Sequence, residues 1–305
     1  MIHPKVSWGR VNMGTALYSY ILLNTKINRR FILATFLLFP IISFAGVYGN
    51  DNRQLVHTED LSQFNQQGIY PAALVESKKI KTQGNTVTVD ATLLGDQWGM
   101  CEENRFYSQP TSAHCSGFFV NDDKVLTAFH CIKKLEDFND LTFILNFTSN
   151  NEISTSDIEN IFKPVALVNF DENLDFAILK VDKKIKDFQP PTFANLPDLP
   201  SHSVELAMLG HPLGMPLTYT DGGFIKSYDQ VKREYQTNLD AFHINSGSVV
   251  FLKDSHQIVG FLKAGQFDMG IRFRPGIPVC NEIRKNNIDQ GAELVQKFPF
   301  NSIIF

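Results

Sequence analysis

The sequence predicts an all-β protein with two β domains, each of which is a sandwich or a barrel. Short apolar runs rich in β-forming residues, such as residues 141–145 and 165–168, recur along the chain. Four prolines lie within residues 190–200, and because proline cannot donate to a central strand ladder, this stretch is a connection between domains. With 305 residues, 43% hydrophobic and 20% charged, the chain is long enough for two cores.

Residues 1–45 have the pattern of a secretory signal peptide. They contain five basic residues and no acidic one, and they end in the apolar residues 31–45, with small residues at Ser43 and Ala45. We expect cleavage after Ala45. A membrane anchor is the alternative, but 15 residues interrupted by Pro40 are fewer than the ~20 that span a bilayer. The mature protein is therefore predicted to be secreted or periplasmic, without a stable membrane anchor.

The charge of the mature chain argues against nucleic acid as a partner. Of the 28 basic residues, 5 lie in the leader, which leaves 23 against 32 acidic residues and a net charge of −9. Such a chain repels phosphate backbones, and the sequence has no cluster of Lys and Arg interleaved with aromatic residues.

The segment that follows the leader is mostly polar. Apart from the alternating residues 86–90, which predict a strand, residues 46–100 contain little apolar periodicity. We therefore expect an arm packed on the body rather than a domain. The first β domain follows over residues 101–189.

The second half of the chain begins after the proline-rich link at residues 190–200. Short strands over residues 201–275 predict the second β domain. Residues 276–305 form a tail, in which residues 289–297 predict a short helix.

The stretch Asn245-Ser246-Gly247-Ser248 is a candidate for a nucleophile. A serine followed by two small residues, where a polar loop enters the apolar residues 249–251, is typical of a surface-presented nucleophile on a β scaffold. Asn, Ser and Gly also favour tight turns, so ordinary turn chemistry is the alternative for this stretch alone. A serine hydroxyl is a poor nucleophile without a base, so the partners decide between the two.

Two upstream residues in similar strand-end settings are candidates for the base and for the carboxylate that orients it. His130 ends the apolar run at residues 124–129, and Asp175 leads into the apolar residues 176–179. Taken singly, a packed or surface histidine and a turn residue are the plainer interpretations. With Ser246 they occur in the order His, Asp, Ser, which is one of the known orders of the catalytic triad.

These three segments together resemble the chymotrypsin/trypsin family of serine peptidases. Residues 126–131 (LTAFHC) resemble that family's L-T-A-x-H-C, residues 175–179 (DFAIL) its D-I-A-L-L, and residues 245–248 (NSGS) its N-S-G-S-P. Residues 209–214 (LGHPLG) resemble a G-[HY]-P segment of the bacterial branch, which includes the glutamyl endopeptidases. The resemblance covers roughly residues 100–270 and implies two antiparallel β-barrels of the chymotrypsin type, with the active site in the cleft between them.

The resemblance also implies a role for each residue. His130 is expected to be the general base, Asp175 to hold its imidazole tautomer, and Ser246 to be the nucleophile and one oxyanion donor through its backbone N–H. This chemistry needs no metal and no organic cofactor. We expect a monomer that cleaves protein or peptide substrates through an acyl-enzyme.

Ile244 departs from the family pattern, which has a glycine two residues before the nucleophile. That glycine supplies the second oxyanion N–H, and a β-branched residue reaches its backbone angles only at a cost of roughly 1 to 3 kcal/mol. An N–H that points away removes about 2.7 to 4 kcal/mol of transition-state stabilisation. Two functions therefore stay open: an exported serine endopeptidase with reduced activity, and a catalytically silent homologue that binds protein in the same cleft.

Two further positions bear on activation and specificity. Asn245 stands where animal trypsins have an aspartate that pairs with the freed N-terminal ammonium, so we expect that switch to be absent. Asp240 lies six residues before Ser246, at the position that forms the base of the trypsin specificity pocket and would favour Arg or Lys. The alternatives are that Lys263 neutralises Asp240 or that Asp240 caps a loop.

The four cysteines of an exported protein are expected to pair, with three possible connectivities. Cys115 and Cys131 flank two apolar runs joined by a turn, so the ends of this hairpin can meet. The resemblance implies a disulfide at these two positions, beside His130. Cys101 and Cys280 are then left for a second disulfide. The cysteine spacing does not match a zinc site.

Overall fold

The computed structural model describes most of the chain after the predicted leader: residues 46–84, 86–132, 140–148, 155–196, 204–265, 268–276, 278–287, 291 and 293–298. The signal peptide predicted at residues 1–45 and its cleavage site lie outside the described residues, as do residues 197–200 of the predicted link. Among the helices of the described part, none has the length and apolar character of a membrane span.

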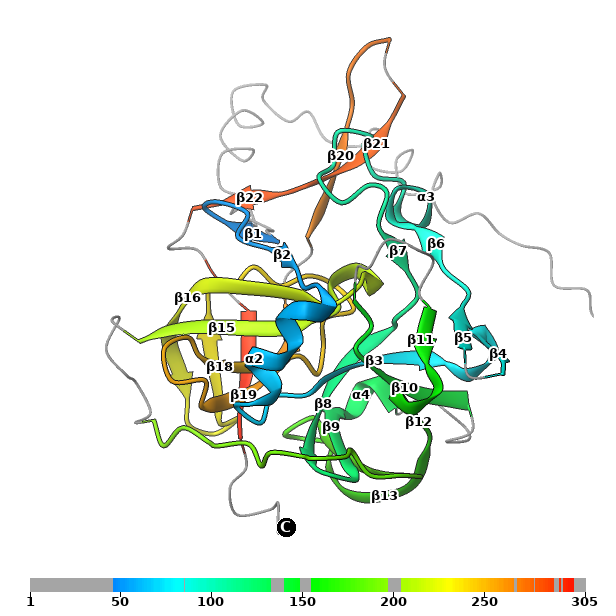
Figure 1. Ribbon diagram of the computed structural model, residues 1–305. Coiled ribbons are helices and arrows are strands. Elements are labelled where there is room, and N and C mark those ends of the chain that lie inside the picture. The colour runs from blue at the N-terminus through cyan, green and yellow to red at the C-terminus, as the bar shows by residue number, and fades with distance from the viewer. Residues whose placement is uncertain are drawn as a thin grey trace, which may run out of the picture. The chain divides into compact units, whose positions relative to one another are not determined.

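The first sheet contains seven antiparallel strands in the order β12-β10-β3-β8-β9-β14-β13 (Figure 1). They are β3 (Pro71–Glu76), β8 (Cys115–Asn121), β9 (Lys124–Ala128), β10 (Leu141–Leu145), β12 (Ile161–Phe162), β13 (Pro164–Asp171) and β14 (Phe176–Val181). The register of β9 against β14 pairs Ala128 with Phe176. His130, just after β9, and Asp175, just before β14, are therefore brought to the same edge of this sheet.

The second sheet closes on itself, because β15 pairs with both β16 and β18. The closed barrel has the strand order β15-β18-β19-β23-β17-β16, and β2 pairs with β16 at its side (Figure 1). These strands are β2 (Gln54–Leu55), β15 (Glu205–Gly210), β16 (Thr218–Asp229), β17 (Glu234–Thr237), β18 (Val249–Leu252), β19 (Ile258–Ala264) and β23 (Glu293–Lys297). The predicted pair of antiparallel barrels is confirmed, with the first one a curled, open sheet.

Shorter elements lie outside the two main sheets. The strands are β1 (Val47–Tyr48), β4 (Ile80–Gln83), β5 (Thr86–Val89), β6 (Thr92–Leu93), β7 (Pro110–Thr111), β11 (Thr155–Asp157), β20 (Met269–Arg272), β21 (Cys280–Ile283) and β22 (Lys285–Asn286). The helices are α2 (Leu61–Asn65), α3 (Leu94–Trp98) and α4 (Phe129–Ile132), with single 3-10 turns at Thr58–Asp60, Ser77–Lys79, Ile158–Asn160 and Pro212–Gly214.

Strand β18 is buried on both faces, because it lies between two cores. Val249 and Phe251 belong to a large cluster that also contains Phe118 and Leu126 of the first sheet. Val250, which points to the opposite side of the strand, packs inside the second barrel. A strand buried on both faces reads as a continuous apolar run, which is the pattern that follows the candidate nucleophile.

Strand β3 corrects the prediction that residues 46–100 form only an arm. It lies between β10 and β8 in the first sheet, and its residues 71–75 are all buried. Because both faces of β3 are covered, the sequence does not alternate, and the two-residue period by which half-buried strands are recognised is missing.

The prediction of a short helix over residues 289–297 is wrong for the part of this range that the structure describes. Residues 293–297 form strand β23, which completes the second barrel between β19 and β17. Its polar residues Glu293 and Gln296 are fully buried. The sequence of this strand is therefore as polar as that of a surface segment, which hides its place in the barrel. Gln296 donates to the backbone carbonyls of Lys232 and Arg233, which satisfies its buried amide.

Both predicted disulfides are present. Cys115, in β8, is bonded to Cys131, in α4, and Cys101 is bonded to Cys280 at the start of β21. The second bond links two segments that flank the barrels at opposite ends of the sequence, with a separation of 179 residues.

We predict that the double variant Cys101→Ser/Cys280→Ser loses more stability than Cys115→Ser/Cys131→Ser. The disulfides span sequence separations of 179 and 16 residues, and the entropy of closing these loops in the unfolded chain corresponds to about 5 and about 3 kcal/mol. Urea unfolding of both double variants measures the two losses. A larger loss for the shorter loop would contradict the prediction.

Candidate active site

A cleft of about 660 Å³ holds all three residues of the predicted triad. It is lined by His130 and Asp175 at the edge of the first sheet, and by Ile244, Ser246 and Lys263 of the second barrel and its loop. Residues separated by more than a hundred positions in the sequence thus share one cavity.

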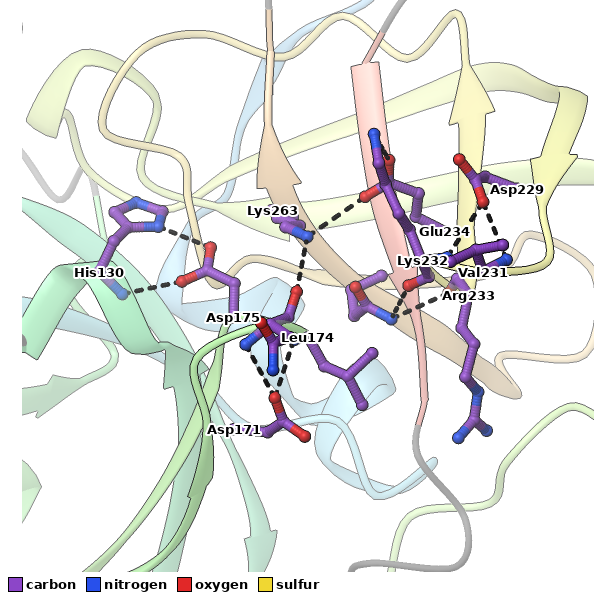
Figure 2. Close-up of polar contacts among 12 residues, drawn as sticks. His130, Asp171, Leu174, Asp175, Asp229, Val231, Lys232, Arg233, Glu234 and Lys263 are labelled. Carbon is purple, nitrogen blue, oxygen red and sulfur yellow. Dashed lines mark hydrogen bonds and ion pairs between the residues drawn. The ribbon is translucent and has the colours of Figure 1, made fainter.

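The carboxylate of Asp175 holds His130 through two contacts. Its Oδ2 lies 2.7 Å from His130 Nδ1, and its Oδ1 accepts the backbone N–H of His130 at 2.9 Å (Figure 2). The Asp175 carbonyl accepts the N–H of Phe129 at 2.9 Å, so the backbone is fixed as well. Asp175 has a φ of 57°, a left-handed conformation that Asp tolerates better than most residues. The Asp175 side chain is 13% exposed and the imidazole 47%, so the base faces the cleft while the carboxylate is covered.

Ser246 lies in the loop that leads from β17 into β18, and this loop is bonded to both barrels. The Ser246 carbonyl accepts the N–H of Ser116 in β8 at 2.8 Å, and Gly247 donates to the carbonyl of Leu262 in β19 at 2.7 Å. Gly247 has a φ of 87°, and a Cβ there would lie 2.0 Å from the Ser116 carbonyl oxygen. The small residue after Ser246 is therefore required by the close approach of the two sheets.

The hydroxyl of Ser246 donates to the carbonyl oxygen of Lys263 at 3.4 Å. Within the described residues, the Ser246 hydroxyl has this hydrogen bond and none to the imidazole of His130. Both side chains line the same cleft, and such hydrogen bonds are often long or misaligned before a substrate is bound.

Ile244 adopts the backbone conformation that the family pattern assigns to glycine, with a φ of 75°. The carbonyl of His243 accepts the N–H of Leu213 at 2.7 Å. In a trans peptide the C=O and N–H point in opposite directions, so the N–H of Ile244 points away from Leu213. Across the described part of the chain, neither this N–H nor that of Ser246 has a hydrogen-bond acceptor. Two donors near the nucleophile are thus available for a ligand.

Asp240 is placed differently from the prediction. It is 3% exposed, and its carboxylate accepts the backbone N–H groups of Tyr48 at 2.8 Å and Asn52 at 3.1 Å. It does not line the cleft. Burial raises the pKa of this carboxyl to about 6. The structure therefore supports the loop-capping alternative, with the segment after the predicted leader as the partner.

The segment that follows the predicted leader packs against the start of the nucleophile loop, a contact that the sequence did not reveal. Arg53 is fully buried, and its guanidinium lies 3.8 Å from the ring centre of Phe242 and 4.7 Å from that of Phe106. Asp51 accepts two hydrogen bonds from the guanidinium, at 2.9 and 2.8 Å. Phe242 lines the cleft two residues before Ile244, so the cation–π contact fixes the start of the loop. An arginine in a polar segment gives no sequence signal for such a position.

Asp268 is a second buried carboxyl that the sequence did not single out. It is 2% exposed and accepts the backbone N–H of His243, the residue before Ile244. Burial raises its pKa to about 7. The carboxyl therefore holds the nucleophile loop in a place where burial disfavours its charged form.

His211 and Asn245 belong to the sequence motifs but are buried and do not line the cleft. His211 is 1% exposed and its burial lowers its pKa to about 4, so it is neutral, and its Nδ1 lies 3.0 Å from the Met215 carbonyl. Asn245 is 2% exposed and its side-chain oxygen accepts the Ser248 hydroxyl at 2.7 Å. Asn245 thus serves the loop by a neutral hydrogen bond.

In the described part of the chain, one group of possible metal ligands lies at the cleft. The ligand atoms of Cys115, His130 and Cys131 lie within 4.8 Å of one another. The two sulfurs are joined in a disulfide, so they are not thiolates and do not offer a metal site.

We predict that Asp268→Asn stabilises the protein at pH 8 but much less at pH 5. The folded pKa of about 7 lies above the usual 3.8, so the carboxyl favours folding while it is protonated, and this contribution is lost as the pH rises through 7. Asparagine does not ionise, and the gain at pH 8 is up to about 4 kcal/mol. Thermal unfolding at both pH values measures it, with the exposed Asp187→Asn as control. Equal effects of Asp268→Asn at the two pH values would refute the prediction.

Comparison with known proteins supports the fold. Residues 115–261 match the model of a family described as trypsin-like peptidase domain. A search of curated proteins finds no match. Among solved structures, a Glu endopeptidase in complex with MPD is 16% identical, with 78% of this chain and 93% of that chain covered and a TM-score of 0.45.

A second solved structure is the inactive form of a serine-to-alanine mutant of a protein from M. tuberculosis H37Rv. It is 18% identical, with 60% of this chain and 75% of that chain covered and a TM-score of 0.37. The family match and the observed strand order together identify a chymotrypsin-like fold of two β-barrels.

Proposed function

We propose that the protein is an exported serine endopeptidase that hydrolyses peptide bonds through an acyl-enzyme on Ser246. The observation that carries the proposal is the 2.7 Å contact between His130 Nδ1 and Asp175 Oδ2 in the cleft that Ser246 also lines. A carboxylate that accepts from Nδ1 leaves Nε2 as the free base, the tautomer that can take a serine proton. The match to the trypsin-like peptidase domain includes all three positions and supports the same reaction class.

In the proposed cycle, His130 takes the proton of Ser246 Oγ as the hydroxyl attacks the substrate carbonyl. The tetrahedral oxyanion accepts the N–H groups of Ile244 and Ser246, and Asp175 stabilises the imidazolium. His130 then returns the proton to the leaving amine. Water attacks the resulting ester by the same route and restores the free serine.

A catalytically silent homologue that binds protein in the cleft is the second candidate. It is favoured by the β-branched side chain of Ile244 in a left-handed backbone conformation. The hydrogen bond from Leu213 to the His243 carbonyl favours catalysis instead, because it leaves the Ile244 N–H directed away from Leu213 and without an acceptor among the described residues. We therefore place the active enzyme first.

The substrate is proposed to be a protein or peptide, without a preference for Arg or Lys, since the Asp240 carboxylate is engaged by Tyr48 and Asn52. Membership of the glutamyl-endopeptidase branch stays a proposal, which a panel of peptides that differ before the cleaved bond would test. Two disulfides fit an oxidising compartment, so we place the mature enzyme in the periplasm or outside the cell. We expect it to act as a monomer.

We predict that a fluorophosphonate probe labels the folded protein at Ser246. The probe reacts with serines that an adjacent base activates, so Ser246→Ala and His130→Ala abolish the labelling, whereas Ser248→Ala of the same loop keeps the target serine. Mass spectrometry of the labelled peptide identifies the site. Labelling that persists in Ser246→Ala, or its absence from the folded wild type, would overturn the proposal.

We predict that Ile244→Gly changes the labelling rate by less than about tenfold. The loop already has the glycine-like φ of 75°, so the substitution relieves backbone strain without a new oxyanion donor. A gain of about a hundredfold or more would instead show that the donor is misplaced in the wild type, as the silent homologue requires. Second-order inactivation rates of the two proteins with the same probe give the answer.

A further inference from the structure

We propose that Lys263 is a positioning residue that ties the Asp175 loop of the first barrel to Glu234 of the second. Its ammonium lies 3.2 Å from Glu234 Oε2 and donates to the carbonyl oxygen of Asn173 at 3.4 Å. Figure 2 shows Lys263 between Glu234 and the loop that carries Asp175. The inference rests on the proposed function, since it assigns a partner to the loop that carries Asp175 of the proposed triad.

The position of Lys263 in its strand explains the direction of its side chain. The register of β19 against β23 shifts between Leu262 and Ala264, so Lys263 is the extra residue of a β-bulge. Bulges turn a side chain away from the regular alternation of a strand and are frequent next to active sites. Lys263 thereby reaches the cleft with its backbone and the Asp175 loop with its ammonium.

Lys263 contacts both ends of the proposed catalytic apparatus. Its carbonyl oxygen accepts the hydroxyl of Ser246 at 3.4 Å, and its ammonium bonds Asn173, two residues before Asp175. One residue of the second barrel therefore sets the distance between the nucleophile and the loop of the orienting carboxylate. A shift of Asp175 would turn the imidazole of His130, because the carboxylate holds it through both oxygens.

The loop before Asp175 is a tight turn, so the single contact of Lys263 with the Asn173 carbonyl can fix its position. Asp171 Oδ1 accepts the N–H groups of Asn173 at 2.8 Å and Leu174 at 3.1 Å, which closes a tight turn (Figure 2). This turn leaves the Asn173 carbonyl directed at Lys263. Because two hydrogen bonds hold this turn, a shift of the Asn173 carbonyl would also move Asp175, two residues later.

Glu234 anchors the ammonium from strand β17 of the second barrel. Its side chain is 5% exposed and that of Lys263 is 18% exposed, so the pair is largely shielded from water. Lys232 lies 3.5 Å from the other Glu234 oxygen. The turn before Glu234 is fixed by Asp229, whose Oδ1 accepts the N–H groups of Val231 and Lys232. The carboxylate thus has a defined position from which to hold Lys263.

The test removes the ion pair without leaving a buried charge unpaired. In Lys263→Met/Glu234→Gln both charges are gone, whereas Lys263→Arg keeps a cation and its donors. We expect the double variant to lower kcat on a peptide substrate by roughly ten- to a hundredfold with KM within about threefold, and Lys263→Arg to retain kcat within about threefold. Lys253→Met, which breaks an ion pair of the same barrel outside the cleft, is the control and should leave kcat unchanged.

A second readout does not depend on turnover. A hydrogen bond as short as the one between His130 Nδ1 and Asp175 gives its proton a far-downfield NMR resonance, which Asp175→Ala assigns by removing it. We expect this resonance to shift or broaden in the double variant and to be retained in Lys263→Arg and Lys253→Met.

The outcomes separate the two proposals. A folded double variant with wild-type kcat and an unchanged resonance would overturn the role of Lys263, and so would an equal loss in Lys253→Met. If the wild type shows neither turnover nor probe labelling, the proposed function fails, and the resonance alone decides whether Lys263 positions Asp175. A resonance that changes in the double variant then supports the positioning role, and an unchanged one overturns it.

Discussion

The burial of β18 on both faces is the constraint on which the site depends. Val249 and Phe251 belong to the core shared with the first sheet, and Val250 to the core of the second barrel. The strand cannot slide by one residue without exchanging the two faces, so its register is fixed. Ser246 lies three residues before Val249 and is therefore held at the junction of the barrels. The hydrogen bond from the Ser116 N–H to the Ser246 carbonyl fixes the position of Ser246 relative to the first sheet.

Left-handed backbone conformations gather at this junction. Asp175, Ile244 and Gly247 have φ values of 57°, 75° and 87°. For a side-chain-bearing residue such a conformation costs of order 1 to 3 kcal/mol and persists only where surrounding contacts fix it. Here those contacts come from other segments: Phe129 donates to the Asp175 carbonyl, and Leu213 to the carbonyl before Ile244. The strain is thus maintained by the docking of loops from both barrels.

Local sequence patterns were sufficient for the motif residues but not for the residues that support them. The strand-end settings of His130 and Asp175 follow from neighbours in the sequence. The Cys101–Cys280 disulfide does not, because its cysteines are 179 residues apart and were assigned by elimination. Asp240 is different, because its partner Tyr48 is 192 residues away. The sequence left open whether this carboxylate contacts a substrate or caps a loop, and in the structure the backbone N–H groups of Tyr48 and Asn52 bond it. Strand β3 escaped detection for a physical reason too, since burial of both its faces removes the alternation that marks a strand.

Buried charges around the nucleophile loop need an explanation other than stability. A buried ion pair is often no more stable than well-packed apolar residues of the same volume, because both charges lose their hydration. Arg53, paired with Asp51 and stacked on Phe242, is such a case. An apolar side chain could fill the same space, but it would not select one orientation of the Phe242 ring or one path of the chain around Asp51. Directional contacts restrict the nucleophile loop to a single arrangement. In the proposed mechanism the N–H groups of Ile244 and Ser246 must face the substrate carbonyl, so the site gains more from that restriction than from additional stability.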